Sequence, residues 1–71
     1  MAGSVYRVTE VIGTSSKSWE DAASTAVATA AKSVRDLRVA SVKQADLTIE
    51  EGKISSYRVR LDISFKYEAG D

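Results

Sequence analysis

The sequence predicts an α+β fold with the element order β-α-β-β, in which a three-stranded antiparallel sheet packs on one long helix. Three observations predict this fold. The chain opens with a run of β-branched and aromatic residues, continues with an alanine-rich segment of helical periodicity, and ends with two strand-like segments joined by a Glu51-Gly52 turn. We expect residues 1–71 to form a single domain, because no segment has the composition of a linker, an internal repeat or a low-complexity region.

The first strand is predicted from Val5 to Ile12, where β-branched and aromatic residues are dense. We expect it to stop at Gly13, because a glycine followed by a cluster of threonine and serine is typical of a turn. Ser15 or Ser18 is expected to cap the helix that follows, since a serine hydroxyl accepts a hydrogen bond from the free N–H groups of a first helical turn.

The helix is predicted from about Ser16 to about Arg35, because its apolar residues recur with 3.6-residue spacing. Most of these residues are alanines, which bury little area each but allow the helix backbone to lie close to a sheet. Trp19 is expected to be the one large anchor of this helix in the core. Lys32 and Arg35 are expected in its last turns, where cations complement the negative end of the helix dipole.

The second strand is predicted from Leu37 to Glu50, and its imperfect alternation indicates a bulge. The last strand alternates strictly, so we expect its apolar face to pack on the helix and its other face to meet water or a partner. The apolar face carries Tyr57, Val59, Leu61, Ile63, Phe65 and Tyr67, and the other face carries Arg58, Arg60, Asp62, Ser64 and Lys66.

The composition excludes several functional classes. The chain has no histidine and no cysteine, which removes Ser–His and Cys–His catalytic pairs, disulfides and the usual zinc ligands. Ten Lys and Arg balance ten Asp and Glu, so no net charge attracts nucleic acid or an anionic membrane. No stretch has the length and apolarity of a membrane span or a signal peptide. We therefore expect a non-enzymatic, cytoplasmic protein whose partners are neither nucleic acids nor membranes.

The small size of the chain predicts that it assembles with copies of itself. A chain of 7.6 kDa buries only about 60% of the surface of its unfolded form. At ~25 cal/mol per Å², the gain from this burial is on the order of 100 kcal/mol, and the entropic cost of ordering the residues is about the same. In the absence of disulfides, contacts with neighbouring chains are expected to supply the missing stability.

Four segments of the chain together resemble the dodecins. They are Val5-Tyr6-Arg7-Val8, Val11-Ile12-Gly13-Thr14-Ser15, the alanine-rich helix, and Tyr57-x-Val59-x-Leu61-x-Ile63-x-Phe65. The resemblance covers about residues 4 to 68. It implies a β-α-β-β subunit of a hollow homododecamer, a storage role rather than catalysis and, in many members, flavins bound in stacked pairs.

Two positions depart from the pattern of the flavin-binding dodecins. Those proteins begin the second strand with an Asp-Trp-Phe motif whose indole stacks on the flavin ring, and this chain has Val39 at the tryptophan position. They also have a glutamine on the third strand that hydrogen-bonds the flavin, where this chain has Arg58. Valine has no aromatic face, and a guanidinium offers no acceptor. We therefore expect flavin not to bind at Val39 and Arg58.

These replacements are similar to those of a dodecin variant called calcium dodecin, which implies Ca²⁺ in place of flavin. The segments Ser18-Trp19-Glu20 and Asp36-Leu37-Arg38-Val39-Ala40 carry the same similarity. Ca²⁺ takes six to eight oxygen ligands, and the chain has no EF-hand loop, so a site must pool oxygens from one chain or several. Our candidate metal ligands are Glu20, Asp36 and Asp46.

Each candidate ligand also has a purely structural explanation. Glu20 complements the helix dipole, Asp36 closes the helix, and Asp46 pairs with Arg58 across the hairpin if the turn centres on Gly52. Two other functions also stay open at this point. One is a structural or interaction module without a ligand, and the other is a flavin or coenzyme A carrier with an altered pocket.

Overall fold

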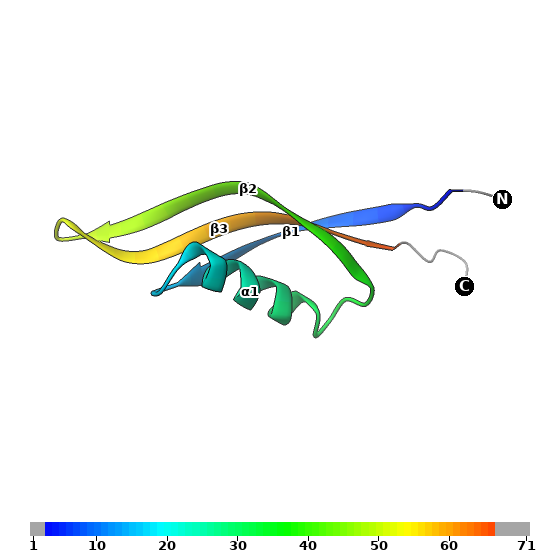
Figure 1. The fold of residues 1–71 in the computed structure, drawn as a ribbon, viewed down its shortest axis with the longest axis horizontal. Coiled ribbons are helices and arrows are strands. Elements are labelled where there is room, and N and C mark those ends of the chain that lie inside the picture. Colours follow the sequence, from blue (N-terminus) through cyan, green and yellow to red (C-terminus); the bar gives the residue numbers. More distant parts are fainter. Residues whose placement is uncertain (1–2, 67–71) are drawn as a thin grey trace.

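The computed structural model describes residues 3–66 and confirms the predicted β-α-β-β fold (Figure 1). Its elements are β1 (Tyr6–Ser15), α1 (Trp19–Ala30), β2 (Leu37–Glu50) and β3 (Lys53–Lys66). The strands form one antiparallel sheet in the order β1-β3-β2, so β3 lies in the centre. The helix lies across one face of this sheet, and we call the opposite side the open face.

The helix covers only the middle of one face of the sheet. It has 12 residues and a length of about 18 Å, whereas the 14 residues of β3 span about 46 Å. The β2–β3 hairpin therefore extends well past the helix (Figure 1), and the molecule measures 56 × 20 × 15 Å. The helix packs on β1 and β3, which leaves most of β2 exposed on both faces.

The hydrophobic core is small and lies between the helix and the central strand. The alternation predicted for β3 is confirmed, because its inward-facing residues are buried against the alanines of α1. The buried hydrophobic residues are Ala22, Ala26, Val59, Leu61 and Ile63. Phe65 and Tyr57 of the same face are half-buried, and Tyr67 lies outside the described residues.

The prediction that the first strand stops at Gly13 is wrong. The strand continues to Ser15, and Gly13 pairs with Val59 inside the sheet. The glycine is needed because α1 crosses β1 here at very close range. A Cβ atom at this position would overlap the carbonyl oxygen of Ala22 and lie 2.8 Å from the Cβ of Ala26. Gly13 therefore serves helix–sheet packing and not a turn.

The helix is shorter than predicted at both ends. It begins at Trp19 because Ser18 is the N-cap: its hydroxyl accepts a hydrogen bond from the backbone N–H of Asp21 at 3.0 Å. Ser15 supports the cap differently, since its hydroxyl donates to the Asp21 carboxylate at 2.7 Å and accepts the N–H of Lys17 at 2.9 Å. One serine caps the helix, and the other holds the loop that leads to it.

At its C-terminal end the helix stops at Ala30, before the two cations that were expected in the last turns. The N–H groups of Lys32 and Ser33 bond three residues back at 3.1 Å, which tightens the chain into a turn. Asp36 then adopts a left-handed conformation with φ 60° and directs the chain into β2. Lys32 and Arg35 consequently lie beyond the helix, and its last turn holds no basic residue.

The hairpin between β2 and β3 has the predicted turn. Glu51 and Gly52 have φ values of 53° and 78°, and two consecutive left-handed residues match the twist of the flanking strands. The predicted bulge is also confirmed, because the pairing of β2 with β3 shifts at three places along the strand. Within the described residues, no helix is long and apolar enough to cross a membrane.

We expect Ser18→Ala to destabilise the fold by about 1 kcal/mol, because the first turn of α1 loses the side chain that satisfies the N–H of Asp21. Urea denaturation monitored by circular dichroism measures this change. Ser41→Ala is the matched control, since Ser41 is an exposed serine on β2. Equal midpoints for the two variants would show that the cap contributes nothing.

Candidate functional site

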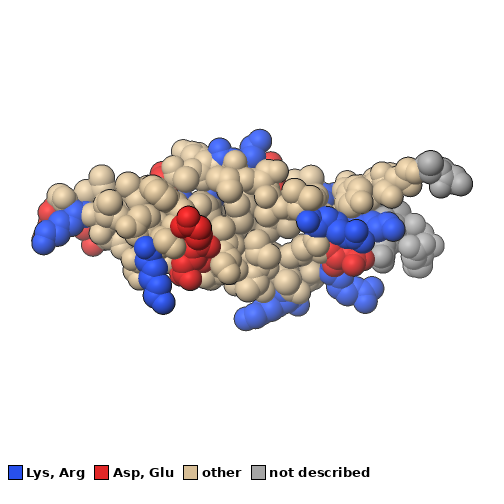
Figure 2. Space-filling model, viewed as in Figure 1, with Lys and Arg blue, Asp and Glu red and all other residues tan. Residues whose placement is uncertain are grey.

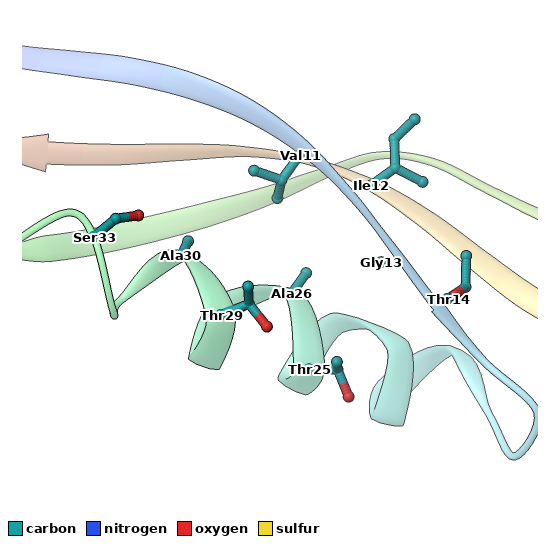
Figure 3. Close-up of a pocket in the computed structure, with 9 residues that line it drawn as sticks. All are labelled: Val11, Ile12, Gly13, Thr14, Thr25, Ala26, Thr29, Ala30 and Ser33. Carbon is teal, nitrogen blue, oxygen red and sulfur yellow. The ribbon is translucent and has the colours of Figure 1, made fainter.

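A groove runs between α1 and the free edge of β1 (Figure 3). Its volume is 390 Å³, and Val11 faces the helix across it while Ile12 points to the other side of the strand. The groove is lined by small, aliphatic and hydroxyl-bearing residues, and none of them is charged. The hydroxyl-bearing residues are Thr14, Thr25, Thr29 and Ser33. Such a lining offers a divalent cation no carboxylate, and none of the predicted site residues lies in it.

The two positions expected to have lost flavin binding lie far apart in one chain. Val39 pairs with Ser64, whereas Arg58 lies six residues earlier on β3, which is about 20 Å along the strand. The pocket beside Val39 has a volume of 120 Å³, below the roughly 300–1,000 Å³ of ordinary ligand pockets. A single chain therefore does not bring Val39 and Arg58 into one flavin-sized cavity.

The three candidate metal ligands also lie on separate elements. Glu20 is in the first turn of α1, Asp36 precedes β2, and Asp46 is within β2. No group of three or more acidic residues that could hold a metal ion occurs among residues 3–66. One chain thus supplies separate carboxylates, and the six to eight oxygens that Ca²⁺ requires must include ligands from elsewhere.

The three carboxylates differ in whether they already form a hydrogen bond or an ion pair within the chain. Neither Glu20 nor Asp36 forms a side-chain hydrogen bond or ion pair with another residue in the described part of the chain. Asp46 is engaged, because Arg58 Nε lies 2.9 Å from its Oδ1 and Nη2 lies 3.4 Å from its Oδ2. The predicted pairing of Asp46 with Arg58 across the hairpin is confirmed.

Trp19 connects the start of α1 to this pair on the hairpin. Its Nε1 donates a hydrogen bond of 3.0 Å to the backbone carbonyl of Asp46, and its ring meets Tyr57 edge-on with the centroids 5.3 Å apart. The side chain is 40% exposed, so the expectation that Trp19 lies in the core is wrong. An indole N–H needs a hydrogen-bond acceptor, and here the exposed edge of the sheet provides one.

The open face of the sheet carries its charges as cross-strand pairs. Arg60 reaches Glu10 of β1 at 3.5 Å, Asp62 meets Lys43 of β2 at 3.9 Å, and Arg58 holds Asp46 as described. In the view of Figure 2, basic and acidic side chains are likewise interspersed. Three of the four charged residues predicted on this face of β3 therefore have partners within the same sheet.

The sequence did not predict a cluster of three hydroxyls on the hairpin, next to the Asp46–Arg58 pair along the two strands. Thr48 Oγ1 lies 2.6 Å from both Ser55 Oγ and Ser56 Oγ, near the hairpin turn. The signal was available, because the register that places Asp46 opposite Arg58 also places Thr48 opposite Ser56. The hydroxyls of the Thr48–Ser56 pair therefore lie on the same face of the hairpin as the Asp46–Arg58 pair.

Together these features define a small β-α-β-β protein whose candidate metal ligands are separate, exposed or half-exposed carboxylates. The sequence model of the family described as Dodecin matches residues 5–68. The chain belongs to the dodecin family. It is 48% identical to calcium dodecin of Mycobacterium tuberculosis over 63 residues, which are 89% of each chain. It is 38% identical to dodecin of Thermus thermophilus over 66 residues, 93% of this chain and 96% of the relative.

Solved structures agree with these relationships. Dodecin from Streptomyces coelicolor superposes with a TM-score of 0.91 and 36% identity, covering 99% of this chain and 100% of the other. Calcium dodecin from M. tuberculosis, described as calcium chelating with a novel calcium-binding site, superposes with a TM-score of 0.81 and 48% identity over 96% and 97% of the two chains. The resemblance inferred from the sequence is therefore confirmed at the level of the family.

Proposed function

We propose that this chain is a non-enzymatic subunit of a hollow homododecamer that binds and stores Ca²⁺ in preference to flavin. The observation that carries the proposal is the 48% identity with calcium dodecin over 89% of both chains. The donor set supports it, because a chain with no histidine or cysteine offers oxygen ligands, which suit a hard cation. We place the single-domain protein in the cytoplasm, with other copies of itself as its partners.

The geometry supports Ca²⁺ sites at contacts between chains. Glu20 and Asp36 are exposed carboxylates on different elements, and neither is neutralised by another described residue. Carboxylates from two or more chains that meet around one ion repel each other when the ion leaves. Ca²⁺ bound there stabilises the assembled form by mass action. The gain is ~2.7 kcal/mol per site when the free Ca²⁺ concentration is 100 times the dissociation constant.

Calorimetric titration of chelator-treated protein with CaCl₂ tests this function. We expect saturable Ca²⁺ uptake, a rise in melting temperature that a chelator reverses, and weaker binding of Mg²⁺, which demands a tighter octahedral geometry. Glu20→Gln and Asp36→Asn should each weaken uptake, whereas Glu50→Gln, an exposed carboxylate at the end of β2, is the matched control. Riboflavin is the control ligand, and its fluorescence should stay unquenched. No Ca²⁺ uptake together with an unchanged melting curve would contradict the proposal.

A further inference from the structure

The sheet ends in two free edges, and these edges differ in their regularity. Among residues 3–66, β1 and β2 each pair only with β3, so one edge of each strand is open. The pairing of β1 with β3 continues without a shift over 10 residues, whereas the pairing of β2 with β3 shifts at three places. Bulges protect an edge from the addition of another strand. β1 is therefore the edge that is open to a further strand.

The groove of 390 Å³ lies along this free edge of β1. Val11 and Gly13 line it from the strand, and Thr25 and Thr29 line it from the helix (Figure 3). A strand that adds to β1 bonds its backbone to the edge and directs every second side chain into the groove. A charged side chain would lose water there without gaining a partner, because no lining residue is charged. The groove thus fits an extended, uncharged segment of polypeptide.

The other edge of the same sheet carries such a segment at residues 39–42. These residues lie between two shifts of β2 and pair regularly with β3, from Val39 with Ser64 to Val42 with Leu61. None of the four is charged, and all four are exposed. Val39 and Val42 are each 61% exposed, so covering them with a neighbour removes apolar surface from water and stabilises the contact.

The two edges also match in direction and in face. β1 and β2 run in the same direction, because both are antiparallel to β3. A second copy placed beside the first, with its helix on the same side, therefore brings its β2 parallel to β1. In this arrangement Ala40 and Val42 face the groove, since they lie opposite Ile63 and Leu61, which pack against the helix.

We propose that residues 39–42 of one copy add as a parallel strand to the β1 edge of a second copy and place Ala40 and Val42 in the groove beside its α1. This inference rests on the proposed function, and it names the surfaces through which the copies associate. The contact joins two different edges, so every chain offers both surfaces and a closed ring of copies can form. A second copy is favoured over a foreign peptide, because every chain carries an uncharged segment opposite its uncharged groove.

Sedimentation velocity of two single variants tests the contact. Val42→Lys and Thr29→Glu each place one charge in the proposed interface. Each should raise the protein concentration at which the assembly dissociates by about tenfold or more, because the charge is buried there without a partner. Both side chains are exposed in the single chain, so neither substitution changes its core.

Recovery of assembly shows whether the two residues meet. An equimolar mixture of Val42→Lys and Thr29→Glu should assemble, since the new ammonium of one copy then pairs with the new carboxylate of the next. The double variant should assemble as well. Because β3 separates the two edges in one chain, the mixture reports on contacts between copies.

Ser24→Glu is the matched control for the groove variant. Ser24 is an exposed residue of α1 that does not line the groove. Ser24→Glu alone should assemble like the unmodified protein, and its mixture with Val42→Lys should not regain assembly. Equal recovery with Ser24→Glu and with Thr29→Glu would indicate a general effect of charge and would overturn the inference.

Three further results overturn the inference while the proposed function stands. If Thr29→Glu prevents assembly and Val42→Lys does not, the groove meets another part of the neighbouring copy. If both single variants assemble normally, the groove lies outside the contacts between copies and is free for a foreign peptide. If both fail to assemble and neither the mixture nor the double variant recovers, the two residues do not meet. An unmodified protein that sediments as a folded monomer overturns the inference and the proposed assembly together.

Discussion

Gly13→Ala should destabilise the protein by about 3 kcal/mol or more, a large part of the 5–15 kcal/mol that stabilises a typical domain. The added Cβ would overlap the carbonyl oxygen of Ala22 and lie 2.8 Å from the Cβ of Ala26. Neither atom is the end of a flexible side chain, because one belongs to the helix backbone and the other is fixed to it. The helix must move away from the sheet, and the small core between them opens.

Urea denaturation followed by circular dichroism and by Trp19 fluorescence measures this loss. Gly52→Asn is the matched control, since a Cβ at Gly52 would meet nothing within 4 Å and asparagine tolerates its left-handed conformation. The control should stay within about 0.5 kcal/mol of the unmodified protein. A Gly13→Ala variant as stable as Gly52→Asn would show that the close approach of α1 to β1 is unnecessary for the fold.

The elements that the sequence predicted well are those set by local patterns. The alternation of β3 places Leu61 and Ile63 in the core because side chains of a strand point to opposite faces in turn. The Glu51-Gly52 turn fixes the register of the hairpin, and this register alone brings Asp46 to Arg58. Both features are determined by residues within one strand or one hairpin, which a sequence pattern can show directly.

The features that the sequence did not predict depend on contacts between distant segments. Gly13 is followed by threonine and serine residues, as is typical of a turn. Only the position of α1 explains why this glycine lies inside a strand. Trp19 has the position of a core anchor, but its hydrogen-bond acceptor is 27 residues away on β2. The helix ends at Ala30 although the apolar spacing continues, because the chain must turn to start β2.

The candidate metal site is less predictable from the sequence than the fold is, because it depends on contacts between chains. Glu20, Asp36 and Asp46 were selected from residue type and similarity, and one chain places them on separate elements. Their role as Ca²⁺ ligands stays a prediction, because completing a coordination shell requires oxygens that other chains bring. Residue spacing within one sequence carries no direct signal of where a second copy of the chain will lie.

The surface of the single chain is larger than a stable monomer of this mass exposes. Its accessible area is 5270 Å², whereas a compact monomer of 7.6 kDa exposes about 4,300 Å². Among the described residues, nine large apolar side chains are exposed in the single chain. They are Val5, Tyr6, Val8, Ile12, Trp19, Val39, Val42, Ile49 and Ile54.

Sedimentation velocity should therefore show a dodecamer at micromolar concentration, with no folded monomer beside it. Among residues 3–66 only five hydrophobic side chains are buried in one chain, so dissociation should cost most of the stability and the free chain should unfold. The midpoint of urea denaturation should rise when the protein concentration is raised about tenfold, because assembly is linked to folding by mass action. A compact monomer with a midpoint independent of concentration would contradict this prediction, since its exposed apolar residues would then be stable in water without any neighbour.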